Sequence, residues 1–304
     1  MYPRIVRIPL PFDIAGIDAI TIYSFGAMMA VAFLVAAYLT RIELDRLYRL
    51  GRLKAVRVPA PGRKGKKGRA HTVEASPSHL VGTITVVAVV GGLVGAKIFH
   101  IVDHFGDFLA DPAGMIFSGG GLTFYGGLIV ATASISWYVK KHGITLSLFA
   151  DAALPTVLLA YGIGRIGCHL AGDGDWGIAS DPAARPAWIP VFLWAETYPN
   201  NILGQTLPET GVYPTAIYEF LMAAFLFCIL WVQRNHPFKP GWLFALALVF
   251  FGIERLLIEQ IRINNTFDLF GLAVTQAEVI SVILILVGAV GLVRTSRRRT
   301  PIPT

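Results

Sequence analysis

Seven stretches of the chain are apolar over about the length that a helix needs to cross a lipid bilayer. A spanning helix takes roughly 20 mostly apolar residues, and the stretches cover residues 18–40, 79–102, 122–140, 149–170, 213–232, 242–263 and 274–293. The pattern predicts an all-α polytopic membrane protein with about seven transmembrane helices. Because seven helices and their connections use the whole chain, we expect one membrane domain over residues 1–304.

The composition supports this interpretation. Of the 304 residues, 55% are hydrophobic and 15% are charged, whereas soluble domains carry about a quarter charged residues. The net charge of +7 does not indicate a nucleic-acid partner, because the basic residues lie mainly in one predicted loop, where they set topology and contact anionic lipid head groups. We therefore expect neither an ordinary soluble fold nor binding of nucleic acid.

The placement of charge predicts the orientation of the helices. The loop 41–77 holds eleven Lys and Arg residues, and the tail 294–304 is also basic. By the positive-inside rule both face the cytoplasm, which puts the N-terminus on the outside. Within the loop, PGRKGKKGR is typical of a flexible linker. The loop 171–211 then lies outside, and its Trp and Tyr residues favour the head-group zone, so we expect it to form a small cap.

The two cysteines are not expected to pair. Cys168 and Cys228 fall near opposite ends of different predicted helices, and that separation is far more than a disulfide can span. No Cys or His cluster has the spacing of metal ligands. We therefore expect neither a structural disulfide nor a metal site.

Polar residues from six predicted helices are expected at one depth, near the outer membrane surface. At about 1.5 Å per residue, Arg165 lies about 20 Å along the fourth helix, and Arg255 reaches a similar level on the sixth. The other residues placed there are Tyr23, Phe25, Lys97, His100, Tyr125, Tyr213, Tyr218, Glu219, Glu259 and Arg262. Charged residues within spans usually face a protein interior or a watery cavity, so this convergence marks a candidate site.

The basic residues at this level outnumber the acidic ones, Glu219 and Glu259. The basic residues are Lys97, Arg165, Arg255 and Arg262. A surplus of positive charge favours an anion, and arginine suits phosphate, which at this depth belongs to a phospholipid head group. Internal pairing is the alternative, because Glu259 shares a helix face with Arg255 and Arg262 and can bridge them. Glu254 lies off that face and is either another partner or a ligand contact.

Several motifs make the chain resemble the bacterial prolipoprotein diacylglyceryl transferases. YGIGRIGCHLAGDGDWG resembles the family signature, a Gly-Arg-hydrophobic-Gly-Asn core followed by Gly-Glu and Trp-Gly. The resemblance continues in GGGLTFYGGLI, DAALP, YPTAIYE and ERLLIEQIR. These motifs occur in order through nearly the whole membrane region. The resemblance does not include residues 41–77 and much of 178–210.

The resemblance implies a reaction and a location. A diacylglyceryl group moves from phosphatidylglycerol to the thiol of the lipobox cysteine in the signal-peptide region of a prolipoprotein. A thioether forms and glycerol phosphate leaves. The thiolate is the nucleophile, and cations on the phosphate stabilise the charge of the leaving group. The family acts in the bacterial inner membrane, so the outside becomes the periplasm. No metal or other cofactor is implied.

The resemblance also assigns site residues. Arg165 corresponds to the arginine that binds phosphatidylglycerol, and Arg255 corresponds to the second essential arginine. The remaining matches to the family are Gly177, Tyr218, Glu219, Glu259 and Arg262.

Four positions depart from the family pattern. Tyr125 stands where the family has an essential histidine, and Cys168 stands where the signature has asparagine. Asp173 replaces the signature glutamate, and the segment between this acid and the Trp-Gly is one residue longer than in the family signature. Phe25 replaces the tyrosine of the first helix, for which Tyr23 is a possible stand-in.

The histidine change leaves the identity of the proton acceptor open. A phenol, with an ordinary pKa near 10, is a poor base near neutral pH unless cations such as Arg165 or Lys97 act on Tyr125. His169, four residues after Arg165 on the same helix face, and His100, three residues after Lys97, are alternative bases. Each histidine by itself is more typical of an interface or hydrogen-bonding residue.

We therefore divide the candidate site into two groups. The catalytic candidates are Arg255, Tyr125, Glu259 and His169. The candidates for binding phosphatidylglycerol are Arg165, Arg262, Lys97, Gly177, Tyr23, Tyr218, Glu219 and Asp173. One rival function is a divergent paralogue that binds phospholipid or transfers lipid to another acceptor. A second rival is a small-solute transporter, but such proteins often contain internal repeats and broken helices, and neither is evident in this sequence.

Overall fold

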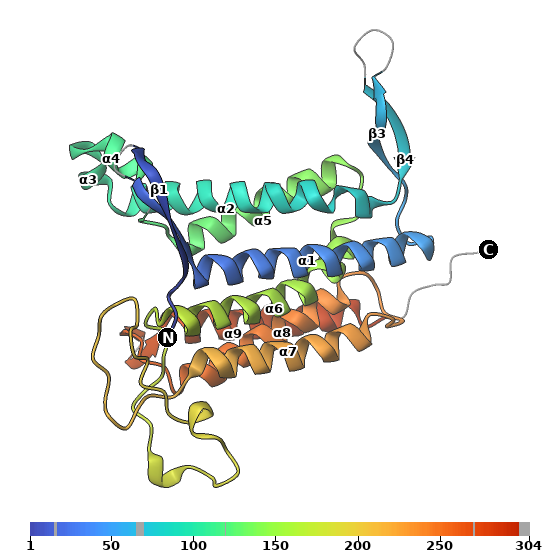
Figure 1. Ribbon diagram of the computed structural model, residues 1–304. Coiled ribbons are helices and arrows are strands. Elements are labelled where there is room, and N and C mark those ends of the chain that lie inside the picture. The colour runs from blue at the N-terminus through green and yellow to red at the C-terminus, as the bar shows by residue number, and fades with distance from the viewer. Residues whose placement is uncertain (15–16, 65–69, 119, 270, 298–304) are drawn as a thin grey trace. The chain divides into compact units, whose positions relative to one another are not determined.

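The computed structural model describes residues 1–14, 17–64, 70–118, 120–269 and 271–297 (Figure 1). The chain forms two compact units, and each is described by itself. The first unit consists of Met1–Ala36 and Ala150–Thr304, and the second consists of Ala37–Phe149. The prediction of a single membrane domain stays a prediction.

All seven predicted helices are present in the described part of the chain (Figure 1). Their bounds are α1 Ser24–Arg49, α2 Val81–Asp103, α5 Phe124–Lys141, α6 Leu146–Ala171, α7 Thr215–Gln233, α8 Trp242–Glu259 and α9 Gln276–Thr295. One short helix, η1 (Pro77–Leu80), precedes α2. Two short helices follow α2, namely α3 (Phe105–Ala110) and α4 (Pro112–Phe117). Two more lie in the loop before α7, namely η2 (Pro182–Ala184) and η3 (Val191–Leu193).

Five helices are long and apolar enough to cross a membrane. They are α1, the continuous helix of η1 and α2, α6, α7 and α9. The other two long helices, α5 and α8, have 18 residues each. Helix α8 carries Glu254, Arg255 and Glu259 within its last six residues, so its apolar part is shorter than the others. The chain is a polytopic membrane protein, with at least five helices suited to span.

Three hairpins add to the helices that the sequence pattern predicts. The strands are β1 Arg4–Ile14 with β2 Ile17–Tyr23, β3 Val56–Lys64 with β4 Ala70–Ala75, and β5 Thr266–Leu269 with β6 Leu272–Thr275, and each pair is antiparallel. The first predicted helix therefore begins at Ser24 and not at residue 18, because Ile17–Tyr23 is rich in β-branched residues that favour strands. The predicted linker 61–69 lies partly outside the described residues, and β3 extends into it as far as Lys64.

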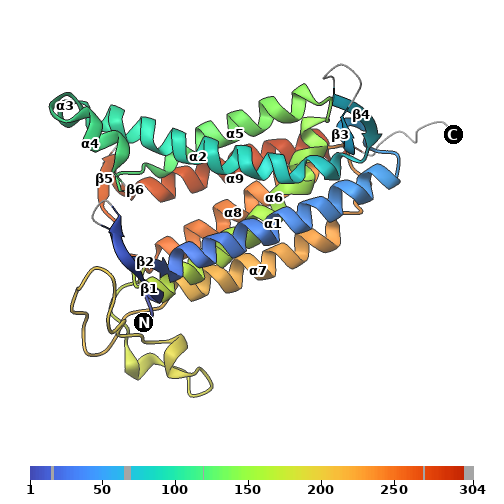
Figure 2. The same ribbon diagram turned by 45° about the horizontal axis from the view of Figure 1, so that its top comes forward.

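Helices α6, α7, α8 and α9 of the first unit run side by side (Figure 1, Figure 2). Their core contains Leu158 of α6, Ala223 and Leu230 of α7, and Leu243 and Ala247 of α8. Small residues allow the close approach of the backbones. A Cβ atom on Gly252 of α8 would lie 2.6 Å from the Ser281 carbonyl oxygen of α9, and one on Gly288 would lie 2.7 Å from that of Ala245.

The start of α8 is held by a carboxylate from α6. Asp151 accepts hydrogen bonds from the backbone N–H groups of Gly241 and Phe244, at 2.7 and 2.8 Å. The first N–H groups of a helix have no partner within the helix, and an anion there also interacts favourably with the helix dipole. The DAALP motif therefore joins α6 to α8 at the end of the unit opposite to Arg165.

In the second unit, α2 packs closely along α5. A Cβ atom on Gly126 would lie 2.6 Å from the Gly95 carbonyl oxygen, and one on Gly91 would lie 3.2 Å from the Ser134 hydroxyl. The glycines of VVGGLVG and FYGG thus serve helix packing, as small residues commonly do in membranes.

Candidate functional site

Three helices bring charged residues together in the first unit. Arg165 lies near the end of α6, Glu219 lies in the second turn of α7, and Arg255 lies near the end of α8. Because α7 starts at the level where α6 and α8 end, these residues meet although more than 50 positions separate the first two. Ion pairs among them confirm the predicted convergence for this part of the chain.

Glu219 lies at the centre of the cluster, and its side chain is fully buried. Arg165 pairs with its Oε2 atom, and its Oε1 atom lies 3.2 Å from Arg255 Nη1 and 3.5 Å from Arg262 Nη1. The Tyr161 hydroxyl of α6 donates to the same Oε1 atom at 2.9 Å. A buried charge is costly unless it is paired and hydrogen-bonded, and Glu219 has partners on both oxygens.

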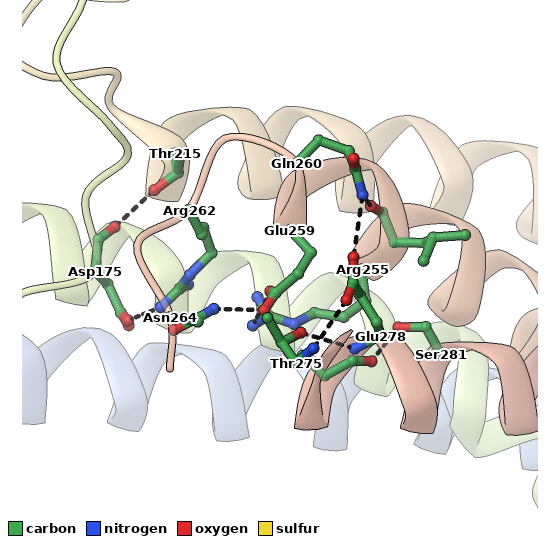
Figure 3. A network of polar contacts seen from close by, with 12 residues as sticks. Asp175, Thr215, Arg255, Glu259, Gln260, Arg262, Asn264, Thr275, Glu278 and Ser281 are labelled. Carbon is green, nitrogen blue, oxygen red and sulfur yellow. Dashed lines mark hydrogen bonds and ion pairs between the residues drawn. The ribbon is translucent and has the colours of Figure 1, made fainter. Parts of the chain in front are cut away.

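Asp175 is the second bridging carboxylate. It pairs with Arg165 through one oxygen and with Arg262 through the other, and its main-chain oxygen accepts a hydrogen bond of 2.7 Å from the Thr215 hydroxyl at the start of α7 (Figure 3). Burial by itself would raise the pKa of Asp175, but Arg165 and then Arg262 outweigh it and hold the pKa below its ordinary value. Asp175 is therefore an ionised partner of two arginines.

Glu259 closes the cluster at the end of α8. Its Oε2 atom lies 2.8 Å from Arg255 Nη2, and its Oε1 atom accepts a hydrogen bond of 2.7 Å from the Asn264 amide (Figure 3). Glu259 does not bridge Arg255 and Arg262 as its position on the helix face suggested, since Arg262 pairs with Asp175 and Glu219. Asn264 instead ties Glu259 to the chain that leaves the helix.

The predicted surplus of positive charge is wrong for the part of the first unit that the structure describes. Three guanidinium groups, of Arg165, Arg255 and Arg262, meet three carboxylates, of Glu219, Asp175 and Glu259. The sequence analysis did not count Asp175 among the acids. We call these six residues the ion network.

Glu254 does not join the ion network. Its side chain is buried, with 1% exposed, and no hydrogen bond reaches either of its carboxylate oxygens from the residues that the structure describes. It is therefore not the internal partner that the sequence analysis considered.

Comparison with known proteins places the chain in a family. A family model described as prolipoprotein diacylglyceryl transferase matches residues 13–294, which is most of the chain. The chain is a member of the prolipoprotein diacylglyceryl transferase family.

Similar proteins carry the full name phosphatidylglycerol–prolipoprotein diacylglyceryl transferase. One from Clostridium tetani is 29% identical over 84% of this chain and 85% of its own length. One from Dehalococcoides mccartyi is 32% identical over 67% of this chain and 73% of its own length. A third, from Pseudomonas paraeruginosa, is 30% identical over 73% of this chain and 77% of its own length.

The glycines of the prolipoprotein diacylglyceryl transferase signature have packing roles in this member. A Cβ atom on Gly167 would lie 3.0 Å from the Met28 Cβ atom and 3.3 Å from the Phe25 Cα atom of α1. A Cβ atom on Gly177 would lie 2.7 Å from the Ile261 carbonyl oxygen, beside the bridge between Gly177 and Arg262. Gly177 thus lets the chain pass close to Arg262, which supports the ion network and gives no direct evidence of lipid contact.

Two predicted site residues hold the segment between α6 and α7, which we call the cap segment (residues 172–214). The Tyr218 hydroxyl donates to the Leu193 carbonyl oxygen. His169 Nδ1 lies 3.1 Å from the hydroxyl of Tyr198, a buried residue that packs with Trp176 and Val212 in a small core. The hydroxyl of Tyr218 and the ring of His169 therefore anchor the cap segment. The role of His169 as a base stays a prediction.

The second unit contains two more predicted site residues. The Lys97 ammonium group donates to the carbonyl oxygens of Met115, Ser118 and Gly120 at 3.1, 3.0 and 2.8 Å, and the Ser118 hydroxyl lies 3.0 Å away. Its three N–H donors are thus used on α4 and on the turn between α4 and α5. Tyr125 lies in the first turn of α5 with 37% of its surface exposed.

Two other predicted residues take part in none of the described ion pairs. The His100 ring of the second unit packs at a tilt against the His104 ring, with centroids 4.4 Å apart. Tyr23 ends β2 in the first unit, opposite Arg4 and 45% exposed. Their assignments to the site stay predictions.

Asp173 is a neighbour of the ion network and not a described partner of its arginines. Its Oδ1 atom accepts the Asp175 N–H at 3.4 Å, and ligand atoms of Cys168, Asp173 and Asp175 all lie within 4.8 Å of one another. Such a group can hold a metal ion by geometry, but Asp175 already pairs with two arginines, and their charge opposes a cation.

Sequence reasoning missed Asp175, Tyr161, Thr215 and Asn264. Asp175 is the second acid of the signature segment GDGDWG, two residues after Asp173, and this was the available signal.

Replacing Asp175 with asparagine should remove a pH-dependent contribution to stability. We expect D175N to lower the free energy of unfolding at pH 7 by about 1–3 kcal/mol, because two buried guanidinium groups lose a counter-charge. The folded-state pKa of Asp175 is lowered, so its contribution is present above the ordinary value of 3.8 and disappears as the pH falls through the lower, folded-state value. Thermal unfolding in detergent from pH 7 to pH 3 measures this. A difference between D175N and wild type that stays constant through pH 3 would contradict it.

Proposed function

We propose that this chain transfers the diacylglyceryl group of phosphatidylglycerol to the cysteine thiol of prolipoproteins. Family membership supports the reaction class, and the names of the similar proteins support the two substrates. The observation that carries the proposal is the ion network, in which three arginines from two helices and the loop after α8 converge on two bridging carboxylates. Guanidinium groups bind phosphate through paired N–H donors.

The lipid phosphate takes the place of Asp175 between Arg165 and Arg262. The two bridging carboxylates differ in how easily they can be replaced. Glu219 is fully buried on a helix, whereas Asp175 lies on the cap segment with 27% of its side chain exposed. A phosphate oxygen offers the same two arginines the acceptor that Asp175 provides, and Glu219 keeps the guanidinium groups oriented meanwhile.

The reaction then needs a thiolate and a stabilised leaving group. The thiolate sulfur attacks the glyceryl carbon that bears the phosphate, the C–O bond breaks, and its electron pair stays on the phosphate of glycerol phosphate. Arg165, Arg255 and Arg262 stabilise the charge that develops on that phosphate. The proton of the thiol passes to a base, for which Tyr125 is the family-position candidate and His169 and His100 are the alternatives.

The orientation follows the positive-inside rule. In our proposal all seven long helices span the bacterial inner membrane, with the basic segment 41–77, whose first nine residues belong to α1, and the tail 294–304 in the cytoplasm. The cap segment and the ion network then lie at the periplasmic side, where phosphatidylglycerol head groups and secreted precursors meet.

A purified assay tests the proposed function. The protein in detergent is mixed with phosphatidylglycerol and a peptide that contains the lipobox cysteine, and mass spectrometry detects the thioether. A cysteine-to-serine peptide is the matched control, because a hydroxyl is a far weaker nucleophile than a thiolate. Glycerol phosphate release without peptide modification would indicate another acceptor and contradict the proposal.

Tyr125 can be tested by restoring the residue that the family carries. We expect Y125H to retain transfer activity or to raise it severalfold near pH 7, because imidazole is a better base than a phenol at that pH. Tyr125→Phe, which keeps the ring and removes the hydroxyl, should lower kcat by about 10²-fold or more. Full activity of the phenylalanine variant would exclude Tyr125 as the base and direct attention to His169 and His100.

A further inference from the structure

The ammonium group of Lys97 on α2 contacts four oxygen atoms of the second unit. It donates to the main-chain oxygens of Met115, Ser118 and Gly120 and lies 3.0 Å from the Ser118 hydroxyl. A charge on a membrane helix is costly unless it finds polar partners, and these oxygens supply them. We call Ser118 and residues 120–123 the α5 turn, since α5 begins directly after them. Lys97 therefore ties α2 both to α4 and to the α5 turn.

The α5 turn is fixed to α2 at two further points. The Thr123 N–H donates to the Ala96 carbonyl oxygen at 3.1 Å. Gly121 has a φ angle of +66°, which favours glycine, and a Cβ atom there would lie 2.3 Å from His100 Nε2. The turn is thus built closely against α2, and Lys97 holds its beginning.

The α5 turn determines where the side chain of Tyr125 lies. Tyr125 is the second residue of α5, two positions after the turn ends. No hydrogen bond reaches its hydroxyl from the residues that the structure describes, and its ring contacts that of its neighbour Phe124, with centroids 5.5 Å apart. Because no bond holds the hydroxyl, the backbone at the start of α5 places the phenol, and a shift of the turn moves it.

The contacts of Lys97 weigh against a lipid phosphate as its partner. An ammonium group has three N–H donors, and the oxygens of Met115, Ser118 and Gly120 use them. Lys97 could bind a phosphate only by leaving these oxygens, and the beginning of the α5 turn would then lose its attachment. Arg165 and Arg262, by contrast, hold Asp175, an anion that a phosphate can replace.

We propose that Lys97 is a positioning residue, which fixes the α5 turn and thereby sets the place of the side chain at position 125. This inference rests on the proposed function, in which Tyr125 is the family-position candidate for the base. Proton transfer requires the acceptor within hydrogen-bond reach of the thiol. Lys97 in this role acts on proton transfer and does not contact the lipid.

A double-mutant cycle with Tyr125 tests the proposal. Lys97→Met keeps an unbranched side chain and removes its donors. In the wild-type background it should lower kcat by about 10- to 100-fold, because the proton acceptor is misplaced, while KM for phosphatidylglycerol changes by less than about twofold. In the Tyr125→Phe background, where the acceptor is already removed, the same substitution should lower kcat by less than about twofold.

Lys140 supplies the matched control, because it lies exposed near the other end of α5. Lys140→Met should keep the wild-type kcat. Lys97→Arg, which keeps donors for the carbonyl oxygens, should recover part of the activity. An equal effect of Lys97→Met in both backgrounds overturns the proposal. A raised KM for phosphatidylglycerol with kcat unchanged also overturns it and assigns Lys97 to the phosphate.

Hydrogen exchange separates failure of this inference from failure of the proposed function. It is measured on the full chain in detergent without substrates, so it needs no transfer activity. In Lys97→Met the amides of residues 120–127 should exchange about tenfold faster or more, because the turn opens more often, whereas those of α9 should exchange as in the wild type. Faster exchange at 120–127, with no thioether formed by the wild type, counts against the proposed function alone. Unchanged exchange at 120–127 overturns the positioning role even if transfer is active.

Discussion

Arg165→Ala should reduce the transfer of diacylglyceryl to a lipobox peptide by about 10³-fold or more. Arg165 pairs with both bridging carboxylates of the ion network, Glu219 and Asp175, and 13% of its side chain is exposed, so it can meet a lipid phosphate. Without it, the developing charge on the leaving phosphate loses a direct partner. The measurement is kcat/KM in the purified assay, with the folded state checked by size-exclusion chromatography and thermal unfolding.

Two further variants make the Arg165 result specific. Arg165→Lys keeps the charge but loses the planar fork of donors, so its activity should fall between that of the alanine variant and the wild type. Arg294→Ala removes an exposed arginine near the end of α9 and should leave activity unchanged. If the alanine variant is folded and transfers at the wild-type rate, Arg165 does not bind the phosphate.

Glu219→Gln should have the largest effect on stability. The substitution keeps the shape of the side chain and leaves Arg165, Arg255 and Arg262 without their shared, fully buried counter-charge. Breaking a buried ion pair by removal of one partner costs about 3–5 kcal/mol. We expect a marked decrease in the midpoint of thermal unfolding in detergent, together with a loss of transfer activity.

Glu209→Gln is the matched control for this substitution. Glu209 lies exposed on the cap segment, where a single charge contributes little, so its variant should unfold like the wild type. If Glu219→Gln also unfolds like the wild type, the three arginines do not depend on this carboxylate.

The helices could be predicted from the sequence because their lengths and apolar content are local properties. The seven predicted stretches correspond to seven helices, with ends that shift by a few residues in most cases. The start of α1 is an exception, because Ile17–Tyr23 is both apolar enough for a membrane segment and β-branched enough for a strand. Hydropathy alone does not separate these two possibilities.

The meeting of Arg165, Glu219, Arg255 and Arg262 could be predicted because helix direction and rise place each residue at a depth. The partners could not all be predicted, since depth says nothing about rotation around a helix axis or about the path of a loop. Asp175 illustrates this limit. It lies on the cap segment, where no periodic pattern indicates which of two acids, Asp173 or Asp175, turns toward the arginines.

Helices α6 and α8 are joined at both of their ends. Asp151 of α6 binds the first N–H groups of α8, and at the far end Glu219 lies between Arg165 and Arg255. A sliding motion of one helix along the other would break both attachments at once. Sliding of α6 along α8 is therefore opposed at both ends of the pair, whereas release of the partly exposed Asp175 from its arginines would leave these two helices joined through Asp151 and Glu219.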